Sequence, residues 1–208
     1  MDRIPKIFVI NLPHRKDRLS SIIVELKNMN LLDKMEVVKG VIIHAHGTGT
    51  AGIAEAHARC IELAKERGYE RIMILQDDCK FLVDAETFDK EIGTFLDTAG
   101  DWSGLWFGSF GAEMEGFPEY ENKNHFKALW FNQDSGILIN STFYDELIEG
   151  YRFCKDKYIE TGDTVYNIDG WLSRKNKVHM SRVKLCSQAD TFSDRLFTHT
   201  CGGCWKPL

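Results

Sequence analysis

Four apolar residues and a glutamine lead directly into two adjacent carboxylates in the segment Ile72-Met73-Ile74-Leu75-Gln76-Asp77-Asp78. A short apolar run of this kind predicts a buried strand, although periodicity alone leaves a helix open. Two acids at the tip of a buried strand are costly unless a positive charge neutralises them, as a divalent cation with oxygen ligands does. Ligands of open α/β sheets bind beyond the carboxyl ends of the strands. Asp77 and Asp78 are therefore the first candidates for chemistry, and an acidic surface turn is the structural alternative.

The segments before this run alternate between predicted strands and predicted helices. Residues 7–10 and 35–38 are short strand candidates, and apolar residues follow helical spacing over 17–29 and 53–67. The order strand, helix, strand, helix, strand is typical of βαβ units with parallel strands. The predicted fold class is therefore α/β, with a mostly parallel central sheet flanked by helices.

The rest of the chain predicts further elements of the same two kinds within one domain. Turn residues predict loops over 40–52 and 108–124. We expect strands at 105–108, 126–132, 136–140 and about 182–186. We expect helices at 85–96, at 142–153 and from Asp169 onward. A chain of 208 residues suits a single domain.

Composition argues against several classes of protein. A net charge of −5 disfavours a nucleic-acid binder, which needs a basic surface. Because the chain has no apolar stretch of 18 residues and residues 1–5 lack the apolar core of a signal peptide, we expect a cytoplasmic protein without a membrane span.

The cysteines show no disulfide framework, which predicts reduced thiols. Cys201 and Cys204 form a lone CxxC that is one ligand short of a structural zinc site even with His199.

A basic turn follows the first predicted strand, in Asn11-Leu12-Pro13-His14-Arg15-Lys16-Asp17-Arg18. A helix that begins here attracts anions through its free N–H groups, and arginine can hold a phosphate through two parallel hydrogen bonds. The turn therefore indicates a phosphate or nucleotide subsite, with a solvated basic turn as the alternative. The chain lacks a Walker-type glycine-rich loop, which disfavours an NTPase.

Other polar positions are weaker candidates when each is taken alone. His57 falls in the first turns of the helix after a glycine-rich loop, where it either faces a cleft or is a structural histidine. Asp169 precedes a predicted helix, so it either caps that helix or accepts a proton from a hydroxyl nucleophile. Asp163 and Asp134 are further carboxylates in polar breaks of the chain.

In this order the motifs resemble those of glycosyltransferase family 25, the lipopolysaccharide-type galactosyl- and glucosyltransferases. The family opens with a strand reading (I/V)NL-x-x-R-x-x-R, and a later strand ends in Glu-Asp-Asp. The matching segments here are 10–18, 52–57, 76–78, 135–139, Asp169, and Gln188 with Ser193 and Asp194. The chain departs from the family at Gln76, which stands where an acid usually begins the acidic motif.

The resemblance implies a GT-A-type fold and the transfer of a sugar from a nucleotide-diphosphate donor. It implies that residues 1–110 bind the nucleotide sugar and 111–208 hold the acceptor. Asp78, with Asp77 beside it, would bind Mn²⁺ or Mg²⁺, and Asp169 would be the base of an inverting reaction, with Asp134 in reserve. The residues implied to contact the nucleotide sugar are Asn11, Leu12, Arg15, His57, Gln76 and Asp77.

The expected partners are a nucleotide-sugar donor, with a UDP-sugar favoured, and a glycan acceptor. Trp130, Trp171 and Trp205 are candidates for the acceptor side, although buried packing is the alternative for each. Two other functions stay open. A sugar nucleotidyltransferase also needs an acidic metal pair, but it normally carries a glycine-rich loop after the first strand. A carbohydrate-binding domain that has lost activity would explain Gln76.

Overall fold

The computed structural model describes residues 3–108, 125–127, 135–172, 175, 178–181, 183–189, 191–193 and 198–200. Their central sheet has the strand order β2-β1-β3-β7-β5-β8-β6. Its strands are β1 (Ile7–Asn11), β2 (Met35–Lys39), β3 (Arg71–Gln76), β5 (Gly104–Trp106), β6 (His125–Lys127), β7 (Gly136–Asn140) and β8 (Val178–Ser181). All run in one direction except β6 and β7, which run antiparallel to their neighbours.

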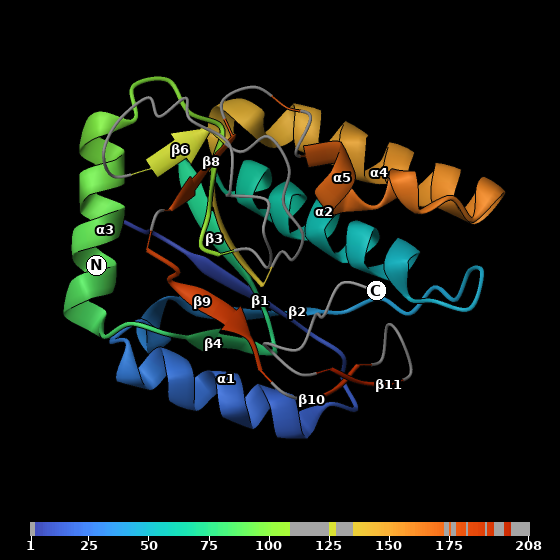
Figure 1. The fold of residues 1–208 in the computed structure, drawn as a ribbon, viewed down its shortest axis with the longest axis horizontal. Helices are drawn as coiled ribbons and strands as arrows, with labels where there is room; N and C mark the ends of the chain where they lie inside the picture. The colour runs from blue at the N-terminus through green and yellow to red at the C-terminus, as the bar shows by residue number, and fades with distance from the viewer. Residues whose placement is uncertain are drawn as a thin grey trace.

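Helices cover both faces of this sheet. The α-helices are α1 (Lys16–Asn28), α2 (Thr50–Glu66), α3 (Ala85–Thr98), α4 (Tyr144–Thr161) and α5 (Ile168–Leu172), with short 3-10 turns at Leu32–Lys34, Ser141–Phe143 and Thr164–Tyr166. α2 and α4 lie side by side over one face together with α5, whereas α1 and α3 cover the opposite face (Figure 1). The predicted α/β class, with a mostly parallel sheet flanked by helices, is confirmed.

The central strands are apolar throughout because they bury side chains on both faces. Along β3, Ile72 and Ile74 pack toward α2 and α4, while Met73 and Leu75 pack toward α1 and α3. Such strands read as continuous apolar runs rather than alternating ones. This explains why the run before Asp77 was recognisable as a strand, and why the equally apolar β7 gave no indication of its antiparallel direction.

Helix ends differ from the predicted ones where tertiary contacts extend them. The helix expected over 142–153 runs on to Thr161, since Cys154 and Tyr158 continue its buried face. It ends at Gly162, whose φ of +71° is the left-handed conformation that glycine adopts most easily. α2 begins at Thr50 rather than at residue 53, and Gly52 in its first turn lies so close to the Val41 carbonyl that a Cβ would be 2.1 Å from the oxygen.

Two small two-stranded sheets were not predicted. One pairs β4 (Cys79–Phe81) with β9 (Cys186–Gln188), and the other pairs β10 (Thr191–Ser193) with β11 (Thr198–Thr200). The strand expected at 182–186 is wrong: β8 ends at Ser181, β9 starts at Cys186, and 183–185 belong to no strand. The β4–β9 pair matters most, because it places Cys79 opposite Gln188, directly beside Asp78.

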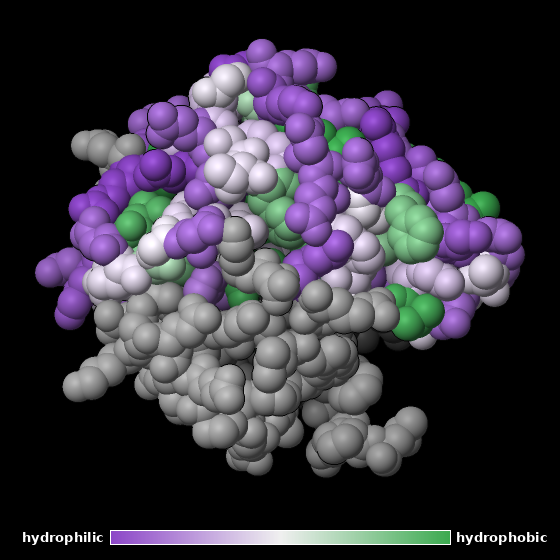
Figure 2. All heavy atoms as spheres, turned by 90° about the horizontal axis from the view of Figure 1, so that it is seen from above, coloured by the Kyte–Doolittle hydropathy of each residue, from purple (hydrophilic) through white to green (hydrophobic). Residues whose placement is uncertain are grey.

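Hydrophilic residues cover most of the described part of the face seen from above (Figure 2). Among the residues that the structure describes, no helix combines the length and apolar character needed to span a membrane. The apolar side chains are concentrated instead in the two clusters on either side of the sheet.

Candidate functional site

The two aspartates and Asn11 meet because β1 and β3 are parallel neighbours. Ile10 pairs with Gln76 at the carboxyl ends of these strands, so Asn11, the last residue of β1, lies beside Asp77, which directly follows β3. The Asn11 Nδ2 group donates hydrogen bonds to Asp77 Oδ2 at 2.7 Å and to the Arg15 carbonyl at 3.0 Å. Asn11 thereby ties the acidic pair to the turn that opens α1.

Arg18 supplies the positive charge that the acidic pair requires. Its Nη1 lies 2.9 Å from Asp77 Oδ1 and 3.0 Å from Asp78 Oδ2, so one guanidinium nitrogen bridges both carboxylates. The Arg18 side chain is 12% exposed, that of Asp77 8% and that of Asp78 2%. Buried charges of this kind persist only when they are paired and hydrogen-bonded.

The small β4–β9 sheet holds Asp78 from the other side. Gln188 Nε2 donates to Asp78 Oδ2 at 2.8 Å, and the backbone N–H of Ala189 donates to the Asp78 carbonyl at 2.7 Å. Within the described part of the chain, Asp78 Oδ1 has no hydrogen-bond partner. A buried carboxylate oxygen without a donor is costly. Asp78 is thus fixed in place with one buried oxygen whose hydrogen-bonding capacity is not used by the described residues.

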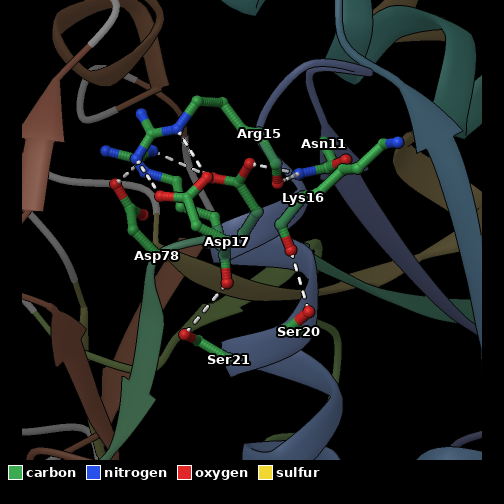
Figure 3. Close-up of polar contacts among 9 residues, drawn as sticks. Asn11, Arg15, Lys16, Asp17, Ser20, Ser21 and Asp78 are labelled. Atoms are coloured by element: carbon green, nitrogen blue, oxygen red, sulfur yellow. Dashed lines mark hydrogen bonds and ion pairs between the residues drawn. The ribbon is translucent and has the colours of Figure 1, made fainter.

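Burial and like charge shape the electrostatics of this cluster. Removal from water, followed by the negative charge of Asp78, raises the pKa of Asp77 above its ordinary value, while Arg18 and Asn11 oppose the rise. On the same turn, Asp17 receives two hydrogen bonds from the Arg15 guanidinium, at 3.0 and 2.8 Å, which hold the pKa of Asp17 below its usual range. Figure 3 shows these groups around the first turn of α1.

Three other residues expected near the nucleotide lie in the segments beside the acidic pair, namely Leu12 and Arg15 in the turn after β1 and Gln76 at the end of β3. Arg15 directs its guanidinium to the exposed Asp17, and the Leu12 carbonyl accepts the Arg15 N–H at 2.8 Å. Gln76 donates its backbone N–H to the Ser135 carbonyl at 3.1 Å, where β3 ends beside β7. The structure therefore brings Asn11, Asp77 and Asp78 directly together, with Leu12, Arg15 and Gln76 in the adjoining segments.

His57 and Asp169 form a second buried polar group, on the α2 and α5 side of the sheet. His57 lies in α2, where its Nδ1 donates to the Ile53 carbonyl at 3.0 Å. Burial lowers the pKa of His57 to about 4, and the negative charge of Asp169 only partly offsets this effect. His57 is therefore a neutral, buried side chain at neutral pH.

Asp169 does not cap its helix, so the capping role that the sequence offered as an alternative is wrong. The cap is Asn167, whose Oδ1 accepts the Gly170 N–H at 2.6 Å, while Asp169 lies inside the first turn and is 4% exposed. Trp171 packs its ring so closely on Gly150 that a Cβ there would lie 2.0 Å from it. Lys175 stacks over the Trp171 ring at 4.1 Å, so this tryptophan has a packing role.

The remaining candidates fall into two groups. Asp163 is an exposed capping residue, since its Oδ1 accepts the Val165 N–H at 2.9 Å. The side chains of other candidates lie outside the described residues, namely Trp130, Asp134, Asp194, His199, Cys201, Cys204 and Trp205.

Arg18 and Gln188 both contact the Asp77–Asp78 pair, a role that the sequence did not predict for either residue. Arg18 belongs to the basic turn and follows Arg15 by one helical turn, a spacing that could have indicated a shared target. Gln188 had only a loose motif match as a signal, because its contact with Asp78 depends on a strand pair that sequence did not predict.

The acidic cluster fits a divalent cation bound mainly through substrate oxygens. Among the described residues, no group of three or more histidine, cysteine or acidic side chains could hold a metal ion. Mg²⁺ and similar ions are nevertheless often bound by one or two carboxylates together with phosphates and water. Asp78, with its buried Oδ1 lacking a hydrogen-bond partner, is the residue that would hold the cation.

Comparison with known proteins gives only distant structural similarity. No family model matches the chain, and no curated protein matches it. The fold is similar to mannose-1-phosphate geranyltransferase from Thermus thermophilus, with a TM-score of 0.44 and 11% identity over 85% of this chain and 72% of that one. It is also similar to a glycosyltransferase involved in glycosylation of the PBCV-1 major capsid (TM-score 0.44, 9% identity, 76% of each chain). A third similar structure is A197 from STIV (TM-score 0.44, 10% identity, 99% of each chain). Similarities this weak establish no family for this chain.

Proposed function

We propose that this chain is a metal-dependent glycosyltransferase of GT-A type that resembles family 25. It moves a hexose or deoxyhexose from a nucleotide-diphosphate donor, with UDP favoured, to a glycan hydroxyl with inversion. The observation that carries the proposal is Asp78, a carboxylate fixed by Gln188 at the carboxyl end of β3 with a buried Oδ1 that has no hydrogen-bond partner in the described part of the chain. Crevices at this edge of an α/β sheet are where ligands bind.

The acidic cluster accounts for the donor half of the reaction. When bound, a divalent cation neutralises the charge that develops on the departing diphosphate. Asp78 would hold that cation, with Asp77 beside it, and Asn11 fixes the Asp77 carboxylate through a hydrogen bond of 2.7 Å. Asn11 and Gln188 already hold the two carboxylates, so neither aspartate needs to move far when the donor binds.

Asp169 is the proposed base for the acceptor half. The attacking hydroxyl oxygen forms a bond to the anomeric carbon while the bond from that carbon to the diphosphate oxygen breaks, and the hydroxyl proton passes to the Asp169 carboxylate. Attack from the face opposite the leaving group inverts the anomeric configuration. Because Asn167 caps α5, Asp169 is not needed to stabilise the helix end. Its low exposure of 4% suits a base that works away from bulk water.

The first test is turnover of a panel of UDP- and GDP-sugars with and without Mn²⁺. We expect metal-dependent release of the nucleoside diphosphate, which occurs slowly with water even without the natural acceptor. Release of pyrophosphate from a sugar phosphate and a nucleoside triphosphate would instead indicate a nucleotidyltransferase. If no donor turns over and nucleotide plus metal produces no thermal shift, the transferase proposal is wrong.

Two substitutions separate the donor and acceptor halves. Asp78→Ala should abolish metal-dependent donor binding, and Asp33→Ala, at an exposed acid, is its matched control. Asp169→Asn should leave donor binding intact and lower turnover roughly 10²- to 10⁴-fold, as expected for loss of a general base. Asp163→Asn is the control for this change, because asparagine can keep the cap at that exposed position. Full transfer activity in Asp169→Asn would exclude Asp169 as the base.

A further inference from the structure

Arg18 occupies the position where the negative charges of Asp77 and Asp78 converge. Its Nη1 contacts one oxygen of each carboxylate, at 2.9 and 3.0 Å, and the three side chains are nearly buried. A cation shared by the two carboxylates would lie close to this guanidinium, because Arg18 already contacts one oxygen of each carboxylate. Two positive charges cannot share the carboxylates at close range without strong repulsion, which is weakly screened in a buried site.

We propose that Arg18 and the divalent cation compete for the Asp77–Asp78 pair, and that the displaced guanidinium binds the donor diphosphate. This inference rests on the proposed function and assigns to Arg18 a second role in it. Asp78 Oδ1 is the entry point, because it lacks a hydrogen-bond partner in the described part of the chain while Oδ2 is held by Arg18 and Gln188. The cation gains both carboxylates only when Arg18 moves.

The place of Arg18 in the fold favours the diphosphate as its second partner. Arg18 lies in the first turn of α1, whose free N–H groups and positive end of the helix dipole attract anions. A guanidinium can hold phosphate oxygens through two parallel hydrogen bonds. The diphosphate bound to a cation at Asp78 therefore lies within the same small region. Metal and diphosphate together provide Arg18 with a new anionic partner, whereas metal alone does not.

Opposite effects on the two ligands distinguish this role from a structural one. Arg18→Gln should bind Mn²⁺ alone about tenfold or more tightly, because the competing charge is gone. At saturating Mn²⁺ the same variant should bind UDP about tenfold or more weakly, because a charge-assisted hydrogen bond to the diphosphate is lost. A purely structural Arg18 would weaken both affinities. Mn²⁺ binding is measured by electron paramagnetic resonance of free Mn²⁺, and UDP binding by calorimetry.

Two further variants complete the experiment. Lys27→Gln removes the same charge from the opposite end of the same helix, at an exposed position, so both affinities should stay within about twofold of wild type. Arg18→Lys keeps the charge and the fold if Arg18→Gln is unstable. It should bind Mn²⁺ as wild type does and UDP several-fold more weakly, because an ammonium lacks the planar fork.

The outcomes separate this inference from the proposed function. If wild type turns over a donor with Mn²⁺ but Arg18→Gln binds Mn²⁺ no more tightly, the competition is refuted and the function stands. If Arg18→Lys binds UDP as tightly as wild type, the diphosphate role is refuted. If neither wild type nor Arg18→Gln binds Mn²⁺ or UDP, the proposed function itself fails.

Discussion

His57 should make this protein less stable as the pH falls below neutrality. Its imidazole is fully buried, and its pKa is lowered from the usual 6.5 to about 4. Between these two values the unfolded chain binds a proton that the folded chain does not bind. The free energy of unfolding therefore decreases as the pH falls from 6.5 toward 4, and this loss levels off below the folded-state pKa.

The size of the effect follows from the pKa shift. The pKa of His57 is 6.5 in the unfolded chain and about 4 in the folded chain. This difference lowers the free energy of unfolding by about 3 kcal/mol once the pH lies below both values. Over the experimentally convenient range from about pH 7 to about pH 5, the same two values give a loss of about 2 kcal/mol. This is a large fraction of the stability of an ordinary domain, so unfolding experiments can resolve it.

The measurement compares urea unfolding of wild type and His57→Asn across that pH range. Asparagine can retain a donor to the Ile53 carbonyl, which His57 Nδ1 contacts at 3.0 Å, while it removes the titrating ring. The variant should lose about 2 kcal/mol less than wild type between the two pH values, even if it is less stable overall. Parallel profiles for wild type and His57→Asn would refute the reasoning.

Three further substitutions test the surroundings of the site. Gly150→Ala places a Cβ 2.0 Å from the Trp171 ring and should displace α5, so turnover should drop about tenfold or more while UDP titrations stay unchanged. Gln188→Leu removes the 2.8 Å hydrogen bond to Asp78 and should cost about 1.5–3 kcal/mol in urea unfolding; an unchanged midpoint would contradict this. Gly52→Ala should lower the melting temperature through a loss of about 1–3 kcal/mol, because its Cβ meets the Val41 carbonyl oxygen at 2.1 Å.

Local patterns in the sequence were sufficient to predict the central elements of the fold. The apolar run of β3 is recognisable because both faces of the strand are buried, and α2 is recognisable from apolar residues at helical spacing. Asp77 and Asp78 stand out because acids directly after a buried strand require compensation. The apolar strand, the helical spacing and the adjacent acids are each visible within a few consecutive residues. They can therefore be predicted from the sequence alone.

Local patterns failed where an element depends on distant partners. The β4–β9 pair joins two three-residue strands, too short to show periodicity, and its neighbours are remote in the chain. The direction of β7 was equally unpredictable, because a strand buried on both faces has the same apolar pattern in either direction.

The sequence by itself therefore determined which residues carry charge at the end of a buried strand, and that this charge needs a positive partner. Only the tertiary structure decided that Arg18 bridges both aspartates, that Asn11 and Gln188 hold them, and that Asp169 lies beside His57 rather than at a helix cap. The physical reason is that burial and charge follow from residue type and local pattern. The choice of partner instead depends on strand register and helix placement, which form only when distant segments of the chain pack together.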